Sequence, residues 1–81
     1  MQVYGITISE EVLSALVSRM KNGSSFKAID LEAEATRLGV PHRRKNREAV
    51  AMRVADRLIQ RERKANNIRF DRPDWVWIGQ K

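Results

Sequence analysis

The sequence predicts a mostly α protein with a small β component, in which three helices are followed by a C-terminal β-hairpin. Two long segments, 9–20 and 46–64, repeat apolar residues at the spacing of a helix that buries one face. Segment 30–39 fits a shorter helix, and segment 68–78 has two β-prone runs around a turn. Because 81 residues suffice for one modest core, we expect residues 1–81 to form a single domain.

The first helix is predicted over residues 9–20, after a short and irregular β-like lead. Val12, Leu16 and Met20 stand four residues apart and lie on one helical stripe. Ser9 is a suitable N-cap, because its hydroxyl can accept from a free amide of the first turn. Gly23 is expected to end the helix in the left-handed conformation.

The second helix lies within segment 24–39, whose beginning is open to two interpretations. A brief extended piece can run into Ile29, so that Asp30 becomes the N-cap. A helix that already includes Ala28 fits the apolar spacing as well, but we favour the extended piece. Gly39 is expected to close the helix, and Pro41 turns the chain away from it.

The third helix carries the longest apolar stripe. Its expected buried face comprises Val50, Ala51, Val54, Ala55, Leu58 and Ile59. Its start is predicted near Asn46, or earlier near His42, and the asparagine pair at 66–67 ends it.

A β-hairpin is predicted after the third helix. Ile68 and Phe70 precede the loop 71–74, which contains Pro73, and Trp75 and Trp77 follow it. The two tryptophans lie two residues apart, hence on one strand face. We expect that face to belong to the core; stacking on a base and burial in a dimer interface are the alternatives.

Positive charge is concentrated in one part of the chain. Residues 37–64 hold ten Lys and Arg against three Asp and Glu, a net charge of +7, whereas residues 1–36 carry −2. Such a basic segment suits binding to a polyanion, because neutralised phosphates release their counterions, and nucleic acid is the expected partner. Alternatively, Glu48, Asp56 and Glu62 pair with arginines of a merely solvated helix face.

Composition and motifs argue against several other classes. The chain has no cysteine and a single histidine, so disulfides and thiolate zinc sites are excluded, and we expect no metal and no cofactor. Catalytic triads and phosphate-binding glycine loops are absent, and Asp71 and Asp74 suit a turn, so we expect no enzyme. Neither a membrane-spanning apolar run nor a signal-peptide pattern occurs, and we therefore expect a cytoplasmic protein with no membrane partner.

The element order resembles that of the winged helix-turn-helix superfamily. Residues 31–40, LEAEATRLGV, look like the first helix and turn of the motif, and residues 53–59, RVADRLI, look like the end of a recognition helix. Residues 68–70, IRF, and 75–78, WVWI, look like the strands of the wing. Compared with the family pattern, the turn before the third helix is longer and this helix continues to residue 65.

The resemblance implies a protein that reads double-stranded DNA, with a basic recognition helix in the major groove and a hairpin wing on the backbone. Such a protein would be a small transcriptional regulator or a recombination or replication accessory, with a homodimer as one possibility. Base contacts are then expected from Arg43, Arg44, Asn46 and Arg47. Backbone contacts are expected from Arg53, Arg57, Arg69 and Arg72.

Two other functions fit the same sequence. One is a winged-helix module for protein contacts, such as a small inhibitor or adaptor, which an exposed apolar patch including Trp77 would favour. The other is RNA or single-strand binding through the basic helix and the aromatic hairpin. Competition between duplex DNA, RNA and single strands at matched ionic strength is the experiment that best discriminates among these functions.

Overall fold

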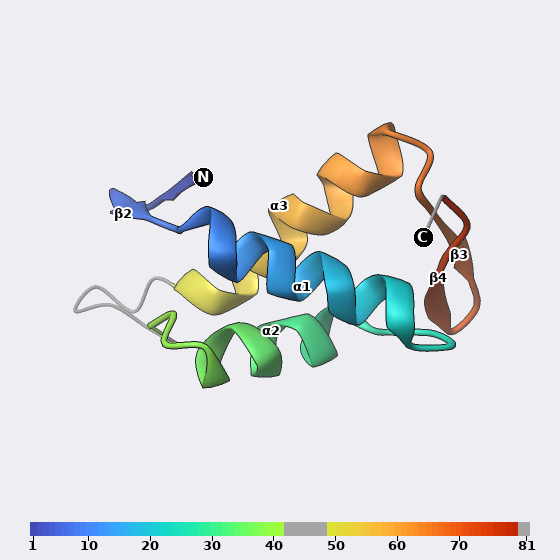
Figure 1. Cartoon of the computed structure of the whole chain (residues 1–81), viewed down its shortest axis with the longest axis horizontal. Coiled ribbons are helices and arrows are strands. Elements are labelled where there is room, and N and C mark those ends of the chain that lie inside the picture. Colours follow the sequence, from blue (N-terminus) through green and yellow to red (C-terminus); the bar gives the residue numbers. More distant parts are fainter. Residues whose placement is uncertain (42–48, 80–81) are drawn as a thin grey trace.

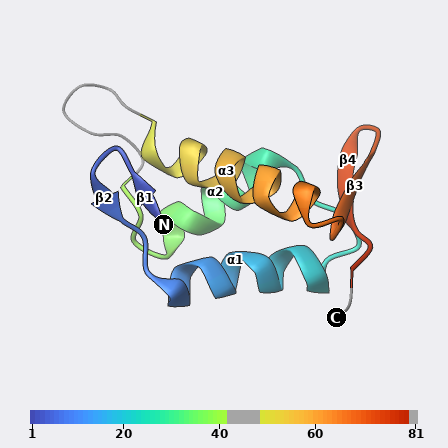
Figure 2. The same cartoon turned by 90° about the horizontal axis from the view of Figure 1, so that it is seen from above.

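A computed structural model describes residues 1–41 and 49–79. Within them the chain forms three helices and two small antiparallel hairpins, so the predicted class, mostly α with a small β component, is confirmed (Figure 1). The elements are β1 (Gln2–Val3), β2 (Ile6–Thr7), α1 (Glu10–Asn22), α2 (Ala28–Arg37), α3 (Val50–Lys64), β3 (Ile68–Asp71) and β4 (Asp74–Trp77). The two hairpins lie at opposite ends of the helical body (Figure 2).

The N-terminal lead is a regular hairpin, which the sequence did not indicate. Val3 pairs with Ile6 across a two-residue turn. Tyr4 and Gly5 both have positive φ, at 51° and 78°, as the turn that matches the twist of paired strands requires. The hairpin places the buried side chain of Val3 against the body of the protein, beside α3.

Helix α1 begins as predicted and ends differently. The Val12 amide donates to Ser9 Oγ at 3.3 Å, so the predicted N-cap is confirmed. The helix continues through Asn22, and the prediction of a left-handed Gly23 is wrong, because Gly23 has φ −90° and ψ 160°. This extended conformation leads the chain directly into Phe26, which pairs with the distant C-terminal hairpin.

The start of α2 is also earlier than predicted. Asp30 is not the N-cap; it lies in the first turn and accepts from the Lys27 amide at 2.7 Å. The reason is a long-range contact: the Phe26 amide donates to the Trp75 carbonyl at 2.9 Å, and the Trp75 amide donates back at 2.8 Å. The extended piece therefore ends at Lys27, and the helix follows at once.

Two helices end with the same local geometry. After α2, Gly39 has φ 98°, the Gly39 amide donates to Thr36 and the Val40 amide donates to Ala35, as in a Schellman motif. The predicted closure at Gly39 is thus confirmed. After α3, Asn66 takes the left-handed position with φ 61°, as asparagine can, so the predicted end at 66–67 is also confirmed.

Helix α3 buries the predicted face. Its six predicted apolar residues are all buried, and they pack chiefly against α2. Leu16, Leu31 and Leu58 are fully inaccessible to solvent and belong to the same core. The expected start of the helix near His42 or Asn46 lies outside the described residues.

The C-terminal hairpin is confirmed, and its aromatics are only partly in the core. Ile68 pairs with Trp77, and Phe70 pairs with Trp75. Both tryptophans are half-buried and pack against the core, whereas Phe26 is the fully buried aromatic residue. The predicted tryptophan face is therefore the core side of the sheet, but it reaches beyond the core.

Candidate nucleic-acid interface

The predicted contact residues divide into two groups. The residues predicted to touch bases, Arg43, Arg44, Asn46 and Arg47, lie outside the described residues. The four predicted backbone contacts are all exposed, and they come from three places. Arg53 and Arg57 belong to α3, Arg69 belongs to β3, and Arg72 lies in the turn between β3 and β4.

Helix α3 presents an exposed polar face opposite its buried one, which we call the outer face. It comprises Arg53, Asp56, Arg57, Gln60, Arg61 and Lys64. Intervals of three and four residues place these side chains on one side of the helix. At a rise of 1.5 Å per residue the row is roughly 16 Å long. Four cations and one carboxylate give it a net charge of +3.

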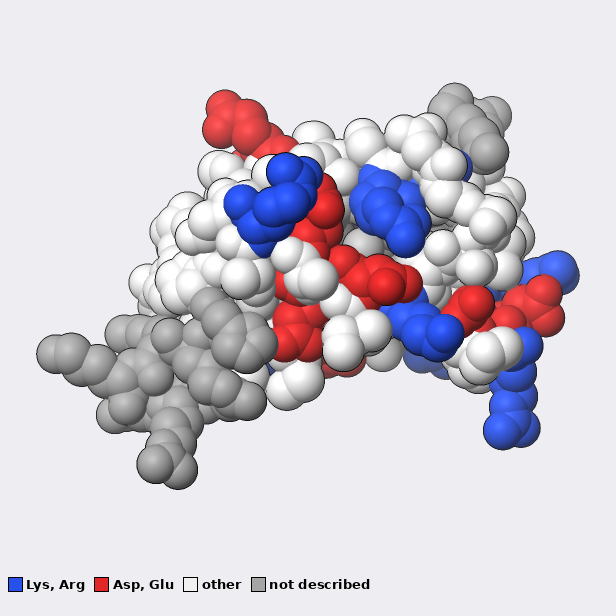
Figure 3. Space-filling view, turned by 90° about the horizontal axis from the view of Figure 1, so that it is seen from below, with Lys and Arg blue, Asp and Glu red and all other residues white. Residues whose placement is uncertain are grey.

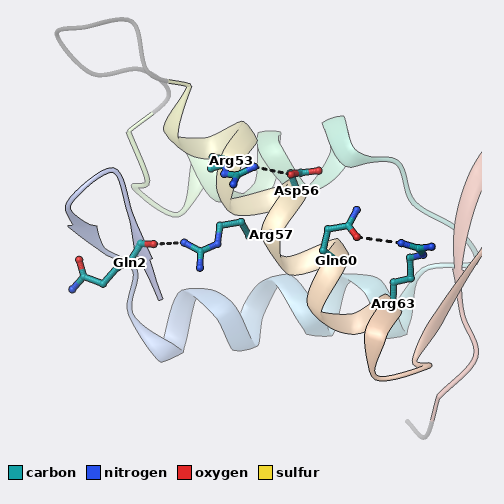
Figure 4. Close-up of polar contacts among 6 residues, drawn as sticks. All are labelled: Gln2, Arg53, Asp56, Arg57, Gln60 and Arg63. Atoms are coloured by element: carbon teal, nitrogen blue, oxygen red, sulfur yellow. Dashed lines mark hydrogen bonds and ion pairs between the residues drawn. The ribbon is translucent and has the colours of Figure 1, made fainter.

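Two of its arginines already have partners within the protein (Figure 4). Arg53 Nη1 lies 3.1 Å from Asp56 Oδ2, one helical turn away. Arg57 Nη1 donates to the backbone carbonyl of Gln2 in β1. Both arginines are exposed, so these contacts orient the guanidinium groups without removing them from water.

Arg61 has a different role from the other cations of the outer face. Its Nε lies 3.0 Å from Oε2 of Glu62, a carboxylate that is only 8% exposed. Asn67 Nδ2 donates to the other carboxylate oxygen of Glu62 at 3.1 Å. Because a buried charge needs partners, Arg61 serves first to hold Glu62, a role that the sequence did not indicate.

Acidic side chains also pair with cations in other parts of the basic segment, residues 37–64. Arg37, the first residue of that segment, forms a bidentate contact with Glu34. The hydrogen bond from Arg37 lowers the pKa of the Glu34 carboxyl, and Glu34 in turn raises the pKa of Arg37. On the face shown in Figure 3, Lys and Arg are interspersed with Asp and Glu, so this side carries no continuous cationic field.

A polar cluster fixes the C-terminal hairpin to the beginning of α2. Asp74 Oδ1 lies 3.0 Å from Lys27 Nζ, and Ser25 Oγ donates to Asp74 Oδ2 at 3.1 Å. The bond from Lys27 lowers the pKa of Asp74 most, and the one from Ser25 adds to this effect. Asp74 therefore has a structural role in this hairpin, beside the backbone pairing of Phe26 with Trp75.

A groove of about 490 Å³ separates the last turn of α3 from the hairpin, and we call it the hairpin groove. Its lining residues are Arg63, Lys64, Asn66, Ile68, Arg69, Phe70 and Trp75. Of these residues, the sequence predicted a binding role for Arg69 and base stacking as an alternative for Trp75, whereas Asn66, Ile68 and Phe70 were predicted only as parts of the helix end and the strands. Lys64 and Phe70 belong to different elements, so no helical or strand spacing in the sequence predicts that they lie together. The turn at Asn66, just after α3, brings them to the same groove.

Trp77 and the exposed apolar side chains bear on the alternative of a protein-contact module. This tryptophan is half-buried, and Lys21 Nζ lies 5.3 Å from the centroid of its ring. The large apolar residues exposed in the described parts of the chain are Tyr4, Ile29, Met52, Phe70 and Ile78. Tyr4 and Met52 border one pocket with Arg53, at the end of α3 opposite the hairpin groove.

Comparison with family models, with curated proteins and with solved structures finds no match to this chain. Within residues 1–41 and 49–79, no helix combines the length and the apolar composition needed to cross a membrane. The same residues contain no group of three or more His, Asp or Glu side chains placed to hold a metal ion.

Proposed function

We propose that this protein binds double-stranded DNA, with α3 as a recognition helix and the β3–β4 hairpin as a wing. The observation that carries the proposal is the outer face of α3, where a row of cations lies exposed and opposite the mainly apolar buried face of the helix. An α-helix fits the major groove of B-DNA, whose width is roughly 12 Å. A row of roughly 16 Å can therefore meet phosphates along the wall of the groove.

The arrangement of elements supports a winged helix-turn-helix. Helix α2 packs on α3, and the hairpin follows α3 directly. The pairing of Phe26 with Trp75 adds a short extended piece, located between α1 and α2, to the edge of the hairpin. In this proposal Arg69 and Arg72 approach the DNA backbone from the hairpin, while the predicted base contacts come from residues 43–47.

The intramolecular contacts of Arg53 and Arg57 are compatible with this role. Arg57 donates to a neutral carbonyl, whereas a phosphate offers a charge-assisted hydrogen bond of roughly twice the strength. The pair of Arg53 with Asp56 is exposed, and such pairs contribute only about 0.2–1 kcal/mol. Both arginines can therefore turn to phosphate at little cost.

The test is the salt dependence of duplex binding. Affinity for a blunt random-sequence duplex should fall steeply with salt, and Arg57→Ala should reduce the log–log slope by about 0.9 if Arg57 neutralises one phosphate. Arg19→Ala, which removes the same charge from α1, is the control and should leave the slope unchanged. Fluorescence anisotropy at several salt concentrations measures the slopes. Affinity that does not depend on salt, or no binding at low salt, would contradict the proposal.

A further inference from the structure

The hairpin groove combines an aromatic wall with a cationic rim. Phe70 and Trp75 are paired residues of β3 and β4, and their ring centroids lie 5.2 Å apart with the planes inclined by 59°. Ile68 and Trp77, the next pair on the same face of the hairpin, pack against the core. Phe70 comes two pairs nearer to the turn than Ile68, and 52% of its surface is exposed. The hairpin therefore presents aromatic surface that no residue of the core covers.

The rim supplies positive charge on the helix side of this wall. Arg63 and Lys64 belong to the last turn of α3 and are exposed. Arg63 Nη1 donates to the neutral amide oxygen of Gln60 at 3.3 Å (Figure 4). Arg69 lines the groove from β3. Among the described lining residues there is no carboxylate, so the groove differs in charge from the outer face, where Asp56 stands among the arginines.

From this combination we infer that the hairpin groove binds an unpaired nucleobase together with its phosphate, that is, a single-stranded nucleic acid. A base has a flat π-face that stacks on aromatic side chains, and the adjoining phosphate satisfies the cations of the rim. A duplex does not offer this ligand, because its bases are stacked on one another and present only their edges. The inference is independent of duplex binding by the outer face, from which the groove shares only Lys64.

Tryptophan fluorescence provides the test, because the groove contains one of the two tryptophans. Titration with an oligothymidylate of eight nucleotides should quench emission. Trp75→Phe removes the tryptophan of the groove and should abolish the quenching. Trp77→Phe removes the tryptophan next to Lys21 and should preserve the quenching. An oligomer of the same length that lacks bases should bind much more weakly. Equal binding of this abasic strand would overturn the inference, since the phosphates alone would then account for the affinity.

Phe70 and Ile78 provide a matched pair of variants. Both are apolar residues of the C-terminal segment, with exposed fractions of 52% and 51%, but only Phe70 lines the groove among the described residues. Phe70→Ala should weaken binding of the oligothymidylate roughly 5- to 150-fold, the range for loss of one stacked base. Ile78→Ala should leave it within about 2-fold. If the two variants bound equally well, the inference would be wrong.

An additional variant, at an exposed residue, tests the groove even if the aromatic substitutions destabilise the fold. Arg63→Gln changes an exposed helix residue and leaves the aromatic wall intact. It should reduce the log–log salt slope of single-strand binding by about 0.7 if Arg63 neutralises one phosphate. An unchanged slope would contradict the assigned rim. Parallel titrations with oligothymidylate and oligouridylate identify whether DNA or RNA is the source of the strand, and tight binding of either supports the groove.

Discussion

The outer face of α3 and the hairpin groove both display cations of the same helix, but the neighbours of these cations differ. On the outer face Arg53 has a carboxylate partner, Arg57 reaches a backbone carbonyl and Arg61 holds a buried glutamate. In the groove, Arg63 contacts a neutral amide and stands beside aromatic rings. The two regions thus carry similar charge but differ in their other side chains. The outer face offers charged and polar groups, whereas the hairpin groove adds an aromatic surface.

Because the two regions differ in this way, net charge does not by itself identify the ligand of a basic protein. The basic segment predicts a polyanion as partner, and the cations of both regions are equally compatible with that prediction. In our proposal, the distinction between a duplex and a single strand comes from Phe70 and Trp75, which lie outside the basic segment.

The largest effect is expected from the buried face of α3, because both the outer face and the hairpin groove depend on the packing of this helix. Leu58 is fully buried in the face of α3 opposite the cations. Leu58→Ala should lower the free energy of unfolding by about 2–5 kcal/mol, through lost burial and the cavity left behind, and should impair both binding activities together. Met52→Ala, at an exposed position of the same helix, should change stability by about 0.5 kcal/mol or less. Chemical denaturation measures both; an unchanged Leu58→Ala would contradict the assigned buried face.

A smaller effect is expected from the carboxylate of the outer face. Asp56→Asn removes the charge that pairs with Arg53 and should raise duplex affinity about 1.5- to 5-fold, the range for an exposed ion pair. Single-strand binding in the groove should not change, because Asp56 does not line it. Glu11→Gln on α1 changes the net charge equally and serves as the control. If both variants raised duplex affinity to the same extent, the effect would belong to net charge rather than to the outer face.

The smallest effect concerns the attachment of the hairpin and depends on pH. The pKa of Asp74 in the folded protein is lowered from its usual value of 3.8 by Lys27 and Ser25. Its contribution to stability is therefore complete above the usual value and is lost as the pH falls through the lowered one. Asp74→Asn should be less stable than the parent protein at pH 7, and the difference should shrink toward pH 3. Asp71→Asn, at the paired exposed position, is the control; a difference independent of pH would exclude this role of Asp74.

Local sequence signals predicted those parts of the fold that local physics determines. The apolar spacing fixed the buried face of α3, the hydroxyl of Ser9 marked the start of α1, and Gly39 marked the end of α2. Each depends on residues within one or two helical turns. The same kind of signal placed Arg53 and Arg57 on an exposed face.

Long-range contacts decided what the sequence could not predict. The start of α2 depends on the pairing of Phe26 with Trp75, nearly fifty residues away, so Asp30 became a first-turn residue. The burial of Glu62 depends on Asn67, which can reach back only after Asn66 turns the chain. The exposure of Phe70 depends on where the core ends, and no local pattern records that position.

The central claim, that two regions of one surface recognise different nucleic acids, is tested most directly by crossing two variants with two ligands. Arg57→Ala and Phe70→Ala are each titrated with a blunt duplex and with an oligothymidylate, after denaturation has shown that both variants are folded. Arg57→Ala should weaken duplex binding and spare the single strand, and Phe70→Ala should do the reverse. If both variants weakened both ligands in parallel, the outer face and the hairpin groove would form one site, and the claim would be wrong.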